Sequence, residues 1–481
     1  MKKRLFMFAT AALMLAACSN DGEVAVNDGA AQLQSGSGAV AFDIYTSSAT
    51  KAGVAGVMTT EKLKTADEGF GVFAMYQDNG DYPSPNNSLV PNFMFNEHVH
   101  YADGWTYSPL KYWPNETDHD SQTPNPAEAG SDHVDKLSFF AYAPYVSTGT
   151  GATLDNASGN MIVNTTGPAI KAAFASTTPQ TSGILSIIRE YEANDPLVEY
   201  GISSNPDQNV DLLWGVAPVG MSYKDVSGGT TTATAGLPLL NMVKPDKDQK
   251  MKFLFQHALS RIGISVVSAI DQIAAGDDGN KYTTDATRVL IEEVTIWGNF
   301  GKKGVLNLNN GTANVANWIE ASIDRTASTE GTPQFTINAT NEWLAEDLRY
   351  DDSKITEIAS DADKFTELKE GVLPSEKALM QVDASSNPRY FMVIPSDLTP
   401  TATTINVKIK YHVVTKDTKL TGNVSNVSNT ITKQTSIQLK SGKSYNLKLI
   451  LGLTSVKLDA TVADWQVDGS NEVYLPQNTA E

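Results

Sequence analysis

The chain has almost no cysteine and no excess of basic residues. Cys18 is the only cysteine among 481 residues, so an internal disulfide and a cysteine metal cage are both excluded. Acidic residues outnumber basic ones by 55 to 36, which gives a formal net charge of -19. Nucleic acids and anionic lipid surfaces are bound mainly through Lys and Arg. A chain this acidic is therefore not expected to bind nucleic acid.

Sequence signatures of catalysis are also missing. There is no G-x-S-x-G elbow, no glycine-rich phosphate loop and no H-E-x-x-H. His98, His100, His119 and His133 stand in polar, loop-like sequence, where histidine is usually solvated, and His257 is expected to be a hydrogen-bonded core residue. We expect no catalytic residue, no metal and no cofactor. Paired glycosidase carboxylates stay open, because their separation in space cannot be read from the sequence.

Long apolar runs are absent except near the start of the chain. Residues 1–17 begin with three basic residues and continue with an apolar stretch shorter than a membrane span, so they are predicted to be a signal peptide. Leu15-Ala16-Ala17-Cys18 resembles the lipobox of bacterial lipoproteins, which implies acylation of Cys18 and anchoring of the mature chain to a membrane. Residues 18–38 are predicted to be a flexible acidic tether. A plain secretory peptide with an incidental cysteine is the alternative.

Strand patterns dominate the remaining sequence. In TTINVKIKYHVVT (403–415), apolar residues alternate with polar ones, which is typical of a strand with one buried face. Many similar short segments are separated by clusters of Gly, Pro, Asn, Asp and Ser. We therefore predict an all-β fold built from antiparallel β-sandwiches.

The length of the chain favours two domains, since single cores stop growing near about 250–300 residues. The polar run VKPDKDQK at 243–250 is the best candidate for the junction. We predict an N-terminal domain over 39–245 with a long insertion near 147–208. The C-terminal domain is predicted over 246–481, with an acidic insertion near 340–380.

Tryptophan supports a second interpretation, because exposed indoles can stack on sugar rings. Five of the seven tryptophans adjoin apolar, strand-like sequence and are expected in the core: Trp105, Trp113, Trp214, Trp297 and Trp465. Trp318 and Trp343 have more polar neighbours and are the better candidates for exposure. The alternative function is thus that of a monomeric glycan-binding surface lipoprotein.

Several segments occur in the order seen in one protein family. They are WTYSPLKYWP (105–114), KLSFFAYAPY (136–145), VDLLWG (210–215), FLFQHALSRIGISV (253–266), GVLNLN (304–309), FMVIPSD (391–397) and GKSYNLKLILGLTSVKLDATVADW (442–465), together with the lipobox. In this respect the chain resembles the fimbrillins, pilus subunits and adhesion lipoproteins of Gram-negative gut and oral anaerobes. The resemblance covers most of the chain.

The resemblance implies two tandem transthyretin-like β-sandwich domains and no catalysis. It implies a structural subunit or accessory adhesin of a pilus, displayed at the outer membrane through a lipid anchor. The implied partners are other pilus subunits, with a host or bacterial surface ligand left open.

The resemblance also implies assembly by strand exchange, in which a protease removes the first strand and a strand of another subunit takes its place. In GAVAFDIYTSS (38–48), Val40, Phe42 and Ile44 fall on one face, so this segment is the candidate displaced strand. The small-residue loop that follows holds Lys51, the candidate processing site.

The chain departs from the arginine-cleaved pattern of the family. No arginine lies between Arg4 and Arg189. An arginine-specific protease is therefore excluded near the candidate strand, which leaves cleavage at Lys51 or no cleavage.

The C-terminal segment SNEVYLPQNTAE (470–481) has two interpretations. Val473 and Leu475 alternate with polar neighbours and could anchor a strand donated to a neighbouring subunit, or an edge strand of the chain's own domain that ends at Pro476. Two aliphatic anchors would hold a partner weakly, which favours the second interpretation.

Overall fold

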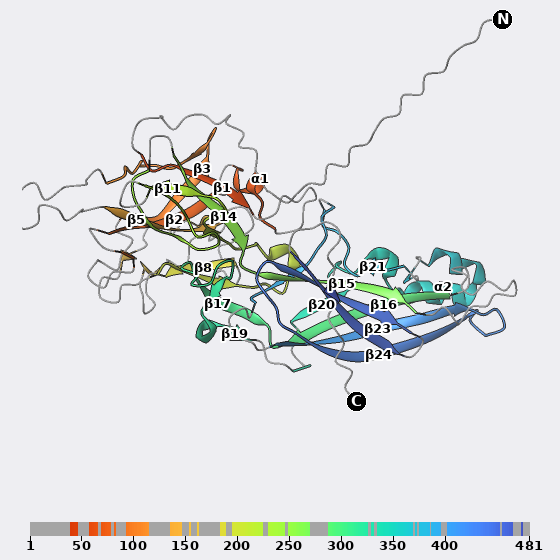
Figure 1. Cartoon of the computed structure of the whole chain (residues 1–481). Helices are drawn as coiled ribbons and strands as arrows, with labels where there is room; N and C mark the ends of the chain where they lie inside the picture. The colour runs from red at the N-terminus through yellow and green to blue at the C-terminus, as the bar shows by residue number, and fades with distance from the viewer. Residues whose placement is uncertain are drawn as a thin grey trace, which may run out of the picture.

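A computed structural model represents the whole chain (Figure 1). The structure describes the residues 39–46, 57–65, 69–77, 81–82, 93–114, 135–146, 153–154, 161–162, 183–188, 195–224, 229–245, 249–269, 287–325, 329–330, 334–368, 371–372, 375–384, 386–395, 402–452, 455–464 and 473–474. Strands dominate these residues and helices are few, so the prediction of an all-β fold is confirmed. The finer prediction of two tandem transthyretin-like domains stays a prediction.

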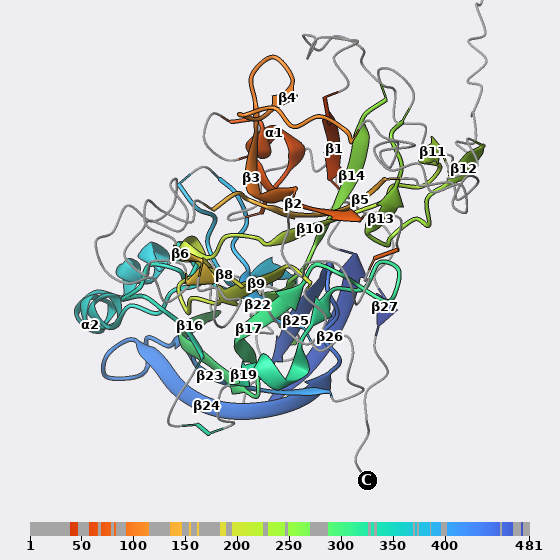
Figure 2. The same ribbon diagram turned by 90° about the vertical axis from the view of Figure 1, so that its left-hand side faces the viewer.

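The first large sheet has eight strands in the order β1-β14-β10-β5-β2-β3-β4, with β13 also paired to β5. β1 runs parallel to β14, and the other pairs within this sheet are antiparallel. Figure 2 shows β1 and β14 side by side at one edge. The strands are β1 (Phe42–Thr46), β2 (Phe70–Gln77), β3 (Met94–Tyr101), β4 (Trp105–Thr106), β5 (Lys136–Ala143), β10 (Leu213–Val216), β13 (Leu239–Met242) and β14 (Met251–His257).

A smaller sheet packs against the same core and joins distant parts of the chain. Its strands are β8 (Gly183–Ile188), β9 (Leu197–Gly201), β17 (Gly301–Asn307), β18 (Asn317–Trp318) and β19 (Asp324–Arg325). β9 and β17 pair in an antiparallel register from Leu197↔Asn307 to Gly201↔Lys303. Val198, Tyr200 and Leu306 belong to the same buried cluster as Phe253 of the large sheet.

The second half of the chain forms a sandwich of two sheets around its own core. One sheet has the order β21-β15-β25-β26-β27, with β22 also paired to β15, and the other has the order β20-β16-β23-β24. Their strands are β15 (Ser260–Ser268), β16 (Thr287–Gly298), β20 (Phe335–Asn338), β21 (Lys377–Ala378), β22 (Phe391–Val393), β23 (Thr403–Lys416), β24 (Val424–Ile437), β25 (Lys443–Leu451), β26 (Val456–Asp464) and β27 (Val473–Tyr474). In β23 the predicted alternation is confirmed, because Ile405, Val407 and Ile409 are buried.

Short elements complete the fold. α1 (Thr60–Leu63) follows β1, and two hairpins pair β6 (Thr153–Leu154) with β7 (Met161–Ile162) and β11 (Ser222–Lys224) with β12 (Thr230–Thr232). The 3-10 helices are η2 (Pro206–Gln208), η3 (Glu320–Ser322), η4 (Glu346–Leu348) and η5 (Ala362–Glu367). No helix among the described residues combines the length and the apolar content that crossing a membrane requires.

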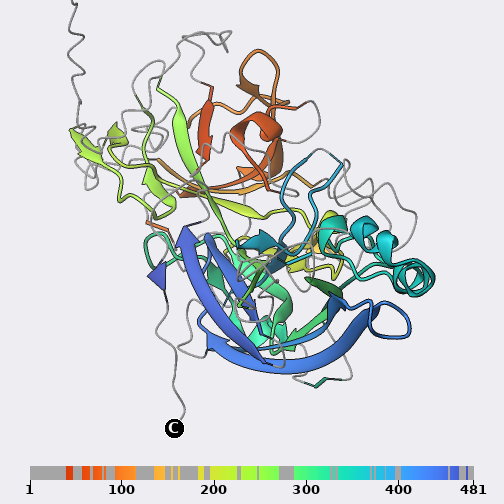
Figure 3. The ribbon, with the colours of Figure 1, turned by 90° about the vertical axis from the view of Figure 1, so that its right-hand side faces the viewer.

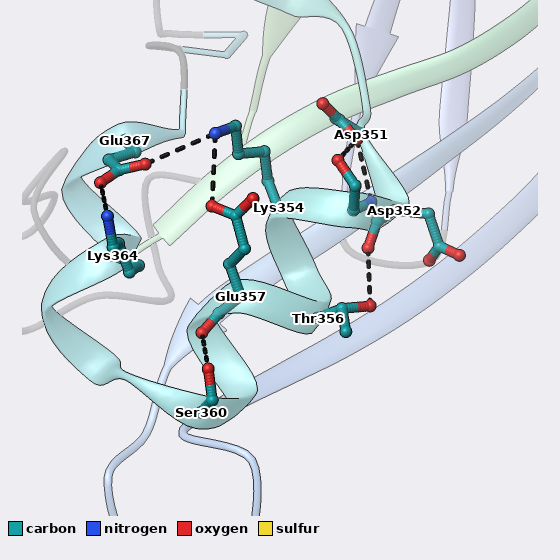
Figure 4. A network of polar contacts seen from close by, with 9 residues as sticks. Asp351, Asp352, Lys354, Thr356, Glu357, Ser360, Lys364 and Glu367 are labelled. Carbon is teal, nitrogen blue, oxygen red and sulfur yellow. Dashed lines mark hydrogen bonds and ion pairs between the residues drawn. The ribbon is translucent and has the colours of Figure 1, made fainter.

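The acidic stretch near 340–380 carries η4, α2 (Asp352–Ser360) and η5. Ile358 and Phe365 of these helices are buried with residues of β16 and β23 in a small separate cluster. On the outer side, Lys354 bridges Glu357 and Glu367, as Figure 4 shows. Exposed ion pairs of this kind contribute at most about 1 kcal/mol, so the buried apolar contacts hold the stretch in place.

The chain changes sheets after β14 and not before it. Residues 258–259 separate β14 of the eight-stranded sheet from β15 of the sandwich, and Figure 3 shows the green strand β14 beside β1. This change of sheets lies within about ten residues of the predicted junction at 243–250. The alternating residues of MKFLFQH complete the core of the first sheet. The division into two folding domains stays a prediction.

The predicted insertion near 147–208 stays a prediction. Its described end carries β8 and β9, whose side chains Ile184, Ile187 and Val198 are buried in the first core. This part of the segment therefore contributes to that core.

We expect Trp318→Phe to lower the free energy of unfolding by about 2–4 kcal/mol. The Trp318 side chain is 2% exposed, and its indole N–H donates to the carbonyl of Ala258 at the change of sheets, 2.8 Å away. Equilibrium denaturation measures the loss. The control is Trp343→Phe, for which the expected loss of unfolding free energy is less than about 1 kcal/mol. The Trp343 side chain is half-buried, and its indole nitrogen has no hydrogen bond with the described residues. Equal losses would contradict the assigned contact.

Candidate functional site

β1 is an edge strand held along one side by β14. The parallel register runs from Phe42↔Met251 to Thr46↔Phe255. Just before β1, the Met251 N–H donates to the Ala41 carbonyl over 2.8 Å. On its other side, β1 has no paired strand among the residues that the structure describes. Its attachment involves one hydrogen-bonded ladder, the side chains of its inner face and a hydroxyl contact of 3.1 Å between Thr46 and Thr60.

A short segment clamps the chain just before β1. The Val40 N–H donates to the Lys111 carbonyl over 2.9 Å, and Ala39 forms an antiparallel bridge with Tyr112. The Tyr107 hydroxyl donates to the Val40 carbonyl over 2.8 Å. Burial raises the pKa of Tyr107 well above its usual range, although a hydrogen bond from the Lys111 backbone opposes the shift. The hydroxyl thus keeps its proton and stays a donor.

The inner face of this segment is fully buried. Val40, Phe42 and Ile44 are 0%, 1% and 3% exposed, and the alternate residues Asp43 and Tyr45 are only half-buried. A strand thus forms in the segment where the sequence suggests one, with the three expected residues facing the core. Its displacement stays a prediction.

Four aromatic rings surround Phe42. Its ring centroid lies 6.3 Å from that of Phe70, 5.8 Å from Tyr107, 5.9 Å from Phe139 and 6.0 Å from Phe253. The Phe70 and Phe139 rings meet it edge-on, whereas the Phe253 ring stacks. Such pairs add about 0.5–1.5 kcal/mol each beyond their buried area. Phe42 is the main anchor of β1.

Residues 57–65 have anchors of their own besides the contact of Thr60 with Thr46 of β1. Val57, Met58 and Leu63 are buried. The Met58 N–H donates to Asp211 Oδ2 over 3.2 Å, and Lys62 Nζ donates to the Val57 carbonyl over 2.7 Å. Residues 57–65 therefore belong to the body of the protein.

Asp211 also contacts the end of β14. His257 Nδ1 lies 2.5 Å from Asp211 Oδ2, and both side chains are buried. This is the hydrogen-bonded core histidine that the sequence suggests. The pair connects the segment after the loop to the strand that β1 covers.

The remaining predicted site residues lie partly outside the described part of the chain. Cys18, Lys51 and Leu475 all fall on undescribed residues. Val473 belongs to β27, which pairs with β26 in the register Thr461↔Tyr474 and Val462↔Val473. The chain thus uses this segment as an edge strand here, and its donation to a neighbour stays a prediction.

The histidine positions assemble no metal site in the described structure. His98 and His100 lie on β3 with ring centroids 5.4 Å apart, and His98 stacks on Tyr145 at 3.9 Å. His119 and His133 lie outside the described residues. Within the described ranges, no group of three or more metal-binding side chains gathers.

The tryptophan prediction is partly wrong. Trp105, Trp113, Trp214 and Trp297 are buried as expected, and Trp465 lies outside the described residues. Trp318 is also buried, because it packs beneath the change of sheets. Its polar neighbours in the sequence do not reveal this packing. Trp343 is half-buried, with its ring edge-on to Phe391 at 6.5 Å. The buried Trp318 weakens the glycan-binding alternative.

The sequence does not reveal three residues that shape the site. Tyr107 stands in a motif that indicates family resemblance but not a contact with Val40. Phe253 lies in a strand pattern that does not identify its neighbours, and Asp211 lies in the motif VDLLWG, which does not indicate its contacts with Met58 and His257. The pairing of β1 with β14 in the structure is what shows that these three residues lie around the same strand.

Comparisons with known proteins identify one curated relative. The fimbrium subunit Fim1C of Phocaeicola vulgatus is 29% identical over 148 residues, which cover 31% of this chain and 32% of that protein. The resemblance to fimbrillins is confirmed. The match spans only about a third of that protein, and no family model matches the chain.

Solved structures give longer but weaker matches. A fimbrial protein from Bacteroides vulgatus has a TM-score of 0.48 and 17% identity, with 89% of this chain and 99% of that chain covered. A candidate cell adhesion protein from Parabacteroides distasonis has a TM-score of 0.36 and 11% identity, with 90% and 97% covered. Both TM-scores are too low to establish a shared fold.

We expect Tyr107→Phe to speed amide hydrogen exchange of residues 39–46 by about fivefold, since one buried hydrogen bond is worth about 1 kcal/mol. Exchange followed by mass spectrometry measures it. Tyr112→Phe is the matched control, because Tyr112 lies in the same segment but is 54% exposed and its hydroxyl has no hydrogen bond with the described residues. An unchanged rate in Tyr107→Phe would contradict the clamp.

Proposed function

We propose that this chain is a structural subunit or accessory adhesin of a cell-surface pilus, assembled by β-strand exchange. The match to a fimbrium subunit supports the pilus role. One observation carries the exchange step: among the described residues β1 is an edge strand that pairs with β14 alone, whereas residues 57–65 are anchored to the body. The role is mechanical, and adhesion follows from display on the surface.

Export as a lipoprotein belongs to the same proposal. Acylation of Cys18 would attach the chain to the outer membrane, and residues 18–38 would hold the folded part away from the lipid. Two or more acyl chains are enough for stable anchoring, since each buried methylene contributes about 0.8 kcal/mol. Cleavage at Lys51 would then separate the anchor from the body.

The position of Lys51 suits such a cut. In the sequence it lies between β1, which ends at Thr46, and the anchored residues that begin at Val57. A cut there leaves the contacts of Met58 with Asp211 in place. The same cut leaves β1 attached by noncovalent contacts alone.

The departure of β1 leaves a surface that strongly favours the binding of a replacement strand. Full burial of a Val, Phe or Ile side chain contributes about 1.5–3 kcal/mol, so the three inward residues of this segment contribute roughly 5–9 kcal/mol as an upper estimate. Their loss would expose apolar surface and the free edge of β14. A strand from another subunit restores both the ladder and the buried face, which is β-augmentation.

Strand exchange is tested by locking β1 in place. In a Cys18→Ser chain with a specific protease site between residues 46 and 57, Asp43→Cys and Lys252→Cys place two thiols at paired positions of β1 and β14. After cutting, the reduced protein should take up a labelled peptide of residues 38–48, because the original strand can leave. The oxidised protein should take up none. Fluorescence anisotropy measures the uptake.

The uncut protein serves as the second control and should also exclude the peptide. Absence of uptake by the cut, reduced protein, while it stays folded by circular dichroism, would contradict strand exchange.

A further inference from the structure

The surface that β1 covers defines the strand that can replace it. We call this surface the β1 site: the edge of β14 with the rings of Phe70, Tyr107, Phe139 and Phe253. We infer that the β1 site selects a strand with a large aromatic residue between two aliphatic residues at positions i-2 and i+2, and that this strand comes from a different chain. The inference rests on the proposed function.

The central position of the β1 site is built for an aromatic ring. The Phe42 ring contacts four aromatic rings at centroid distances of 5.8–6.3 Å. All four belong to residues that are 2% exposed or less. Because protein interiors are close-packed, a smaller side chain at this position leaves a cavity and loses the ring contacts. The flanking positions hold the aliphatic residues Val40 and Ile44, 0% and 3% exposed.

The C-terminal segment of this chain does not fit that pattern. If Val473 and Leu475 are directed inward, the central position, which Phe42 fills in β1, receives a leucine or a valine. With Tyr474 directed inward, its flanking positions hold Glu472 and Pro476. A carboxylate buried without a partner is strongly unfavourable. Neither face of the segment matches the face of β1.

The backbone of the C-terminal segment is also mismatched if the segment lies parallel to β14, as β1 does. The N–H of the inward residue Val40 is directed to Lys111, whereas the carbonyl of the outward residue Ala41 accepts from Met251 of β14. Backbone groups alternate sides with the side chains, so outward residues bond to β14. With Val473 and Leu475 inward, Pro476 is outward and has no N–H to donate.

Trp465, the other aromatic residue after β26, cannot serve as the central residue either. Its neighbour at i-2 is Ala463, which pairs with Ser444 inside the β25–β26 ladder. Directing Ala463 into another subunit would open that ladder. The C-terminal segment is also already paired, through β27, with β26.

Copies of this chain that have lost β1 therefore do not join one another by placing their C-terminal segments in the β1 site. The chain accepts a strand from a different subunit, one whose donated segment carries the aliphatic-x-aromatic-x-aliphatic pattern. This places the chain at a junction between unlike subunits and not in a repeating stretch of identical ones.

Peptide binding to the cut full-length chain tests this selectivity. Four labelled peptides are compared by anisotropy: residues 38–48, the same peptide with Phe42→Ala, residues 468–481, and residues 468–481 with Leu475→Phe, Pro476→Asn and Gln477→Ile. We expect the first and the fourth to bind. The Phe42→Ala peptide should bind about 100-fold more weakly or worse, and the natural C-terminal peptide at least as weakly.

The outcomes separate this inference from the proposed function. If residues 38–48 bind but residues 468–481 bind within tenfold of them, the selectivity is wrong and strand exchange stands. The same holds if the Phe42→Ala peptide binds equally, or if the redesigned peptide fails to bind. If residues 38–48 themselves do not bind, the proposed function fails and this inference fails with it.

Discussion

The parallel contact between β1 and β14 determines how the N-terminal part of this protein works. β14 lies between β1 and β10 and leads directly into the first strand of the sandwich. It therefore supports both halves of the fold while one of its edges is covered only by β1. Phe42 concentrates much of that coverage in one side chain among four rings. A strand attached in this way completes the core, and its separation from the core is the step that we propose.

The two halves of the chain are joined by more than the connection after β14. β17 pairs with β9, so residues near 300 complete a sheet begun near 200. Arg389 forms two hydrogen bonds with Asp207, at 2.6 and 3.1 Å, across the same region. Trp318 adds its bond to Ala258. These contacts keep the β1 site and the sandwich in one continuous body.

Alternating patterns made the strands and their buried faces predictable. The faces of β23 and β1 follow from period-2 alternation, which depends only on local geometry. Pairing was not predictable, because β1 and β14 are about two hundred residues apart in sequence and nothing local identifies a partner. The sheet that residues 251–257 join was not predictable for the same reason, because their strand pattern does not identify a partner. Trp318 shows the limit for burial, since polar neighbours in sequence need not be neighbours in space.

The most direct test of the central claim, that β1 leaves during assembly, is the amino terminus of this protein within surface fibres isolated from cells. Mass spectrometry of the N-terminal peptide measures it. The account predicts a start between residues 47 and 56, with neither Cys18 nor β1 present in the assembled subunit. An acylated chain that still begins at Cys18 and retains residues 39–46 within the fibre would contradict it.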